Sequence, residues 1–139
     1  MLRQVVYTSR ATKNLNTRDL LNLLHQARGF NEVDEISGLL IHSNGYFMQI
    51  IEGTEENIED LVTRLARDTM HTNIKVISDK FINNRLFADW AMGCADFNDP
   101  ALATLPGVTT DFNDATQVQR LLEDILNNTQ QWHAVLQAC

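Results

Sequence analysis

Two apolar runs on either side of a short polar turn constrain the fold of this chain more than any other feature. Residues 36–41 (Ile-Ser-Gly-Leu-Leu-Ile) and 46–51 (Tyr-Phe-Met-Gln-Ile-Ile) flank His42-Ser43-Asn44-Gly45. An Asn-Gly dipeptide supplies the positive φ angles that a tight hairpin turn requires. The two runs therefore predict an inner β-hairpin, and the other elements must be arranged around it.

Further strands and two helices are expected on both sides of this hairpin. Strands are predicted over residues 2–7, 74–82 and 87–95, and helices over about 17–29 and from Gly53-Thr54 to about Met70. In the second helix Ile58, Leu61, Val62 and Leu65 form an apolar stripe that suits packing on a sheet. The resulting order, β-α-β-β-α-β-β, predicts an α+β, ferredoxin-like fold with a five-stranded mixed sheet and both helices on one face.

The remainder of the chain predicts a helical extension. Val118, Leu121, Leu122, Ile125 and Leu126 recur at helical spacing in a helix that begins at about Asp114. Fewer than 45 residues follow Ala95, too few for a separate core. We expect a first domain over residues 1–95 and a C-terminal helical cap over 96–139, packed on the free face of the sheet.

Composition excludes several classes of partner. The chain has 11 Lys and Arg against 18 Asp and Glu, a formal charge of −7 that opposes binding to nucleic acid. No apolar run approaches the roughly 20 residues that cross a bilayer, so no membrane partner is expected. Only two cysteines, Cys94 and Cys139, are present, which excludes a disulfide framework and predicts a cytoplasmic protein.

Gln49 and Tyr7 are the first candidates for a functional site. Gln49 lies in an apolar strand, where an unpaired amide would cost about 1 to 3 kcal/mol. Alternation places Phe47, Gln49 and Ile51 on one face, so the amide is inside the core if that face meets the helices. A buried glutamine bonded to the backbone and a ligand contact are equally compatible with this pattern, and Tyr7 leaves the same choice open.

A row of polar residues on the second predicted helix is a further candidate. Arg64, Asp68 and His71 fall at i, i+4 and i+7 and line one edge of that helix. A surface salt-bridge row is the simpler explanation, and Asn31 is equally explained as a loop residue. The four histidines and two cysteines lack metal-ligand spacing, and no glycine-rich phosphate loop occurs. Neither a metal site nor an enzyme is therefore predicted.

Taken in order, these segments resemble the BLUF family of blue-light sensors that use flavin. The resemblance covers residues 2 to 95 and is carried by Phe47-Met48-Gln49-Ile50-Ile51-Glu52-Gly53 and Trp90-Ala91-Met92 above all. The sequences Val6-Tyr7-Thr8-Ser9, Ile36-Ser37-Gly38-Leu39-Leu40 and Arg85-Leu86-Phe87, together with Asn31, Arg64, Asp68 and His71, match as well. Phe30 and Ser37 depart from the usual pattern of the family.

The resemblance implies a role for each of these residues. It implies a flavin, FAD or else FMN or riboflavin, inserted between the two helices and over the sheet. Tyr7 would donate an electron to the excited flavin, and the Gln49 amide would bridge tyrosine and flavin. Asn31 would bind the C4 carbonyl and N3-H edge. Arg64, Asp68 and His71 would reach the ribityl and phosphate part, while Trp90 and Met92 would lie near Gln49 on the last strand.

The sequence thus predicts a non-enzymatic blue-light photoreceptor. We expect its signal to pass through the last strand and the C-terminal helices to a separate signalling protein, with a homo-oligomer as the vehicle. The alternative is a ferredoxin-like ligand-binding or dimerisation module without a chromophore. The colour of the purified protein distinguishes the two.

Overall fold

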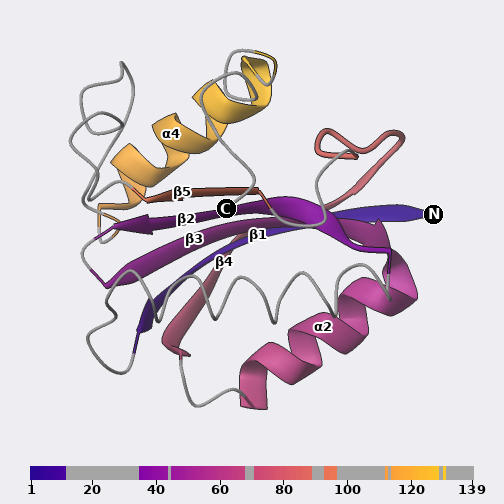
Figure 1. Ribbon diagram of the computed structural model, residues 1–139, viewed down its shortest axis with the longest axis horizontal. Coiled ribbons are helices and arrows are strands. Elements are labelled where there is room, and N and C mark those ends of the chain that lie inside the picture. Colours follow the sequence, from indigo (N-terminus) through magenta and orange to yellow (C-terminus); the bar gives the residue numbers. More distant parts are fainter. Residues whose placement is uncertain are drawn as a thin grey trace.

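The described part of the chain forms one sheet with a helix on each face. The computed structural model describes residues 1–11, 35–43, 45–67, 71–88, 93–96, 112, 114–128 and 130. Its elements are β1 (Leu2–Ala11), β2 (Ser37–Ser43), β3 (Tyr46–Thr54), α2 (Glu55–Arg67), β4 (His71–Ile82), β5 (Gly93–Asp96) and α4 (Ala115–Asn127). Figure 1 shows α2 and α4 on opposite faces of the sheet. The predicted α+β class is therefore confirmed, while the predicted helix over 17–29 lies outside the described residues.

The sheet has the strand order β4-β1-β3-β2-β5. Its neighbours are antiparallel except for β2 and β5, which pair in parallel. Because β1 pairs with β3 on one side and β4 on the other, its polar end is held in two ladders, and the strand extends to Ala11 rather than ending at Tyr7. The central position of β1 and β3 places their side chains between the two helices.

The predicted hairpin is present as β2 and β3. The ladder continues to the pair Ser43 and Tyr46, so the turn is shorter than predicted. Gly45 has a φ of 81°, a conformation that glycine adopts without steric cost. Every residue of β2 is buried, in keeping with the inner position that the apolar runs predicted.

Helix α2 begins at Glu55, directly after the predicted Gly53-Thr54 start, and covers one face of the sheet. The hydroxyl of Thr54 accepts a 3.3 Å hydrogen bond from the backbone N–H of Asn57, which caps the first turn. The acidic Glu55 and Glu56 favour the positive end of the helix dipole. Ile58 is completely buried, and the half-buried Leu61, Val62 and Leu65 pack against the same sheet cluster.

One prediction about this region is wrong: His71 does not lie on α2. The helix ends at Arg67, and His71 is the first residue of β4, where it pairs with Ala11 of β1. The β1–β4 ladder therefore starts three residues earlier than the predicted Ile74. The helical spacing from Arg64 to His71 could not reveal this ladder, because Ala11, the residue that pairs with His71, is distant in sequence.

Helix α4 closes the opposite face. The Asp114 carboxylate accepts hydrogen bonds from the backbone N–H groups of Thr116 and Gln117 at 3.0 and 3.2 Å, so the helix starts where the sequence predicted. Its buried side chains are those of Val118, Leu121, Leu122 and Ile125. They pack against Val6, Leu39, Ile41, Met48 and Ile50 of the central strands. In the described part of the chain, neither helix combines the length and apolarity needed to cross a membrane.

Arg3 ties α2 to the edge of the sheet. Its guanidinium donates two hydrogen bonds to Asp79 of β4, at 2.8 and 2.6 Å, and another to Glu59 of α2. The same guanidinium holds the pKa of the Asp79 carboxyl below its usual value. Three elements are thereby joined near the first turn of α2.

We predict that Gly38→Ala strongly destabilises the fold. A Cβ at Gly38 would lie 1.9 Å from the carbonyl oxygen of Ile50, so the backbone of β2 or β3 must move. The expected loss in the free energy of unfolding is about 3 kcal/mol, measured by urea denaturation. Gly53→Ala is the matched control, because its Cβ would meet only side chains, at 3.3 Å or more. Equal losses for the two variants would contradict the prediction.

Candidate functional site

The site begins with two polar side chains that β1 and β3 place directly opposite each other. Tyr7 and Gln49 are paired residues in the antiparallel ladder. Alternation directs Tyr7 to the α2 face, because its buried cluster also contains Phe47, Ile51 and Ile58. Tyr7 is 3% exposed and Gln49 7%. Gln49 therefore lies inside the core, because the face that it was predicted to share with Phe47 and Ile51 meets α2.

A side-chain hydrogen bond joins these two residues. The Tyr7 hydroxyl donates to Oε1 of Gln49 within the buried interior. A primary amide has an acceptor end and a donor end, so this bond assigns the acceptor end to Tyr7. If the amide turned or tautomerised, the arrangement of donors and acceptors beside Tyr7 would be inverted. The pair therefore has two distinct hydrogen-bonding arrangements available to it.

Apolar side chains surround this polar pair. Strand residues Val5, Leu40, Phe47 and Ile51 share a cluster with Tyr7, and the helix contributes Ile58 together with Leu61, Val62 and Leu65. Hydrogen bonds are stronger in such surroundings than in water. An aromatic hydroxyl and an amide in an apolar environment suit a flat aromatic ligand that carries polar atoms at its edge.

The other predicted site residues fall into three groups. Arg64 lies in the last turn of α2, the helix that covers the face with Tyr7 and Gln49, and it is half-buried. His71 stands at the start of β4 instead of on that helix. Asn31, Asp68, Trp90 and Met92 lie outside the described residues. The structure thus brings Tyr7 and Gln49 together and separates Arg64 from His71 by element.

A second buried polar cluster, on the α4 side of the sheet, was not predicted. Glu52 is completely buried, and its carboxylate accepts hydrogen bonds from the Gln4 side chain and from the backbone N–H groups of Leu86 and Phe87. The signal for it was a carboxylate at the end of an apolar inner strand. Its partners could not be identified, because they come from the first strand and from the turn after β4.

The described residues contain no group of three or more His, Cys, Asp or Glu side chains arranged to hold a metal ion. Tyr7 and Gln49 themselves are also weak metal ligands.

Comparisons with known proteins agree with this geometry. Over 106 residues the chain is 29% identical to photoactivated adenylate cyclase subunit beta of Euglena gracilis, covering 76% of this chain and 12% of that protein. The structure of a bacterial light-regulated adenylyl cyclase matches with a TM-score of 0.76 and 28% identity, over 89% of this chain and 36% of that one. BlsA in its ground state matches with a TM-score of 0.65 and 32% identity, over 69% and 65%.

These relatives differ in size. This chain spans only a small part of the two cyclases, while it covers about two thirds of BlsA. The family model described as "Sensors of blue-light using FAD" matches residues 2–93, which include the whole described sheet up to the start of β5. The chain therefore belongs to the BLUF family of flavin-binding blue-light sensors.

Proposed function

We propose that Tyr7 and Gln49 are the switch of this blue-light photoreceptor. The observation that carries the proposal is the buried hydrogen bond from the Tyr7 hydroxyl to Oε1 of Gln49, on the sheet face that α2 covers. A bound flavin supplies absorption of blue light and, once excited, the capacity to accept an electron. Tyr7 is a phenol within this buried face, and it would give an electron and then its hydroxyl proton to a bound, excited flavin.

The change that persists after the light reaction is in the Gln49 amide. Return of the electron and proton to Tyr7 leaves the amide rotated or tautomerised, with its donor and acceptor ends exchanged. The buried, apolar surroundings make each hydrogen-bonding arrangement a discrete state, because an intermediate orientation leaves polar atoms unpaired. A changed hydrogen bond from the Gln49 amide to a bound flavin would shift the absorption to the red, and thermal reversal of the amide would restore the dark state.

The residues present on the described face fit a flavin. Tyr7 and Gln49 supply a polar edge, and the apolar side chains of β1, β3 and α2 supply the surroundings of a planar ring. We propose that Asn31 binds the C4 and N3 edge and that Arg64, Asp68 and His71 hold the ribityl and phosphate part. His71 would do so from the start of β4 rather than from α2. The flavin we propose is FAD, in line with the family description.

The proposed output runs through the last strand. Trp90 and Met92 immediately precede β5 (Gly93–Asp96), and β5 pairs in parallel with β2, next to the strand that carries Gln49. We propose that residues 1–95 form the sensor and 96–139 its cap. The chain would signal from the cytoplasm, without enzymatic activity of its own, through a homo-oligomer and a separate partner protein. Two of the relatives are light-controlled adenylate cyclases. A partner protein with cyclase activity would therefore fit the proposed output.

Purified protein is expected to be yellow and to respond reversibly to light. Blue light should shift the visible flavin band to the red, and the original spectrum should return in the dark. Absorption spectra before and after illumination measure both changes. A colourless protein that takes up neither FAD, FMN nor riboflavin would contradict the proposed function and favour a binding module without a chromophore.

Removal of either member of the switch pair should abolish the light response but not flavin binding. Tyr7→Phe keeps the ring, and Gln49→Leu keeps nearly the same volume, so both variants should fold. Neither should give the red shift. Tyr46→Phe is the matched control, because Tyr46 is the other tyrosine of the chain and lies at the hairpin end of β3. A normal difference spectrum from either switch variant would show that its residue is misassigned.

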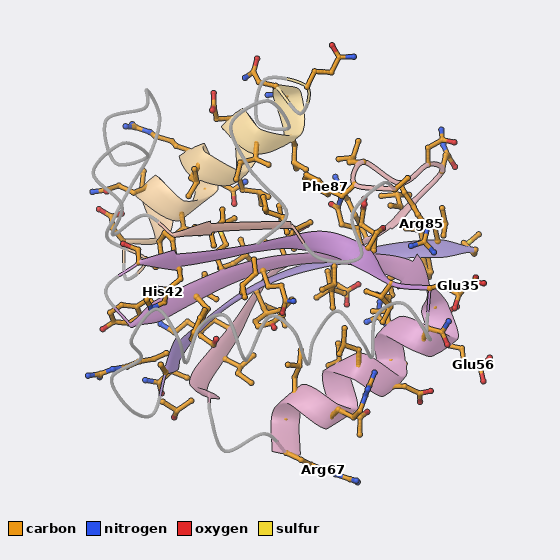
Figure 2. The ribbon with its side chains drawn as sticks, in the orientation of Figure 1. Glu35, His42, Glu56, Arg67, Arg85 and Phe87 are labelled. Carbon is orange, nitrogen blue, oxygen red and sulfur yellow. The ribbon has the colours of Figure 1, made fainter. Side chains whose placement is uncertain are left out.

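Arg64→Ala should weaken flavin binding about tenfold, because it removes a charge-assisted hydrogen bond donor from the phosphate side. The direction of the light-induced shift in the bound fraction should not change. Arg67→Ala serves as the control, because Arg67 is an exposed cation one turn further along α2 (Figure 2). Titration of the flavin-free proteins with FAD measures the affinities. An unchanged affinity for Arg64→Ala would favour a surface salt bridge at this position.

A further inference from the structure

Glu52 is a carboxylate with no exposed surface in a mostly apolar strand. It lies in β3, three residues after Gln49, and its relative exposure is 0%. A buried carboxylate is stable only where hydrogen-bond donors or a cation compensate for the loss of water. The donors around Glu52 therefore show what this residue does in the fold.

Those donors come mainly from the turn that follows β4. The backbone N–H of Phe87 donates to Oε1 of Glu52 at 2.8 Å, and that of Leu86 donates to both carboxylate oxygens at 3.0 Å. On the sheet itself, Nε2 of Gln4 donates to Oε2 at 3.2 Å from the position directly opposite in the ladder. The Oε1 atom of Gln4 is buried without a hydrogen bond, so this amide is oriented by the carboxylate.

Arg85 forms a second set of hydrogen bonds between the same turn and the sheet. Nη1 of Arg85 donates to the backbone oxygen of Glu52 and to the hydroxyl of Ser37, both at 3.0 Å. Arg85, Leu86 and Phe87 are thus all bonded to Glu52, through its side chain or its main chain. We call this set of contacts the Glu52 clasp, formed by Gln4, Ser37 and Glu52 with residues 85–87.

The clasp lies on the face of the sheet opposite to the switch pair. Alternation along β3 directs Gln49 toward α2 and Glu52 toward α4. Phe87 is completely buried in the cluster that includes Val118 and Leu121 of α4. Figure 2 shows Phe87 and Arg85 on the α4 side, at the end of the sheet where α2 begins. One strand therefore carries the switch residue on one face and the clasp on the other.

We propose that Glu52 is a positioning residue for the light switch. It holds the backbone of residues 85–87. It thereby fixes the position from which the chain continues to Trp90, Met92 and β5. Gln49 and Glu52 both lie in β3. Because Glu52 holds residues 85–87 against this strand, the chain that follows residue 87 starts from a fixed position relative to Gln49. The clasp makes this relation rigid and slows rearrangement of the segment. This inference rests on the proposed role of Gln49.

Glu52→Gln tests the clasp in the full-length, flavin-loaded protein. The variant keeps the shape of the side chain but replaces one acceptor oxygen by an N–H₂ group that faces other donors. The backbone amides of Leu86 and Phe87 should exchange with solvent at least about tenfold faster, since a buried hydrogen bond is lost. The amide of Val6 in β1 should keep its protection. Hydrogen exchange in the dark state, followed by NMR, measures both.

The second readout is the rate of dark recovery after blue light. In Glu52→Gln the light-minus-dark spectrum should keep its shape, whereas recovery should become at least about threefold faster because residues 85–87 are less firmly held on β3, the strand that carries Gln49. A merely structural carboxylate would leave this rate unchanged. Glu56→Gln is the matched control: it neutralises an exposed carboxylate at the start of α2 and should alter neither readout.

Arg85→Gln provides an independent test that does not alter the buried charge. It removes the contacts to Ser37 and to the Glu52 carbonyl, and it should change both readouts in the same direction by a smaller factor. Unchanged exchange at Leu86 and Phe87, or faster exchange with unchanged recovery, would overturn the proposal. Failure of the wild type to respond to light would instead refute the switch assigned to Gln49, and the exchange data alone would then decide whether the clasp exists.

Discussion

The register between β1 and β3 is the constraint on which the rest of this structure depends. The ladder places Tyr7 opposite Gln49 and Gln4 opposite Glu52. Because side chains alternate between faces, the first pair lies under α2 and the second lies toward α4. A slip of one residue would exchange the two faces and bring a carboxylate under α2. One set of backbone hydrogen bonds thus determines both buried polar sites.

The apolar side chains on the two faces give these polar groups their properties. On the α2 face, the hydrogen bond between Tyr7 and Gln49 is enclosed by aliphatic and aromatic residues. The Gln49 amide therefore has few other hydrogen-bonding arrangements, and they are distinct from one another. On the α4 face, the Glu52 carboxylate is compensated by backbone N–H groups, which ties a turn to the sheet. Strand β3 is therefore in direct contact with residues 85–87, which follow β4.

The elements that were predicted well are those whose signals are local. The hairpin, the cap of α2 at Thr54 and the cap of α4 at Asp114 each follow from residues within a few positions of one another. The placement of His71 was wrong because the start of β4 depends on its pairing with Ala11, which a helical spacing cannot reveal. Asn31, Asp68, Trp90 and Met92 lie outside the described residues and remain predictions.

The sequence by itself determined the order of the described strands and helices, the burial of the β2–β3 hairpin and the face that Gln49 shares with Phe47 and Ile51, because periodicity and turn chemistry act over short stretches of chain. It also contained the ordered motifs of the BLUF family. Only the tertiary structure decided which groups meet. The bond from Tyr7 to Gln49 joins residues 42 positions apart, and those from Leu86 and Phe87 reach back 34 and 35 positions to Glu52. Such partners are determined by strand register and by the packing of the turn on the sheet. The sequence within a few positions of these residues contains no signal for either.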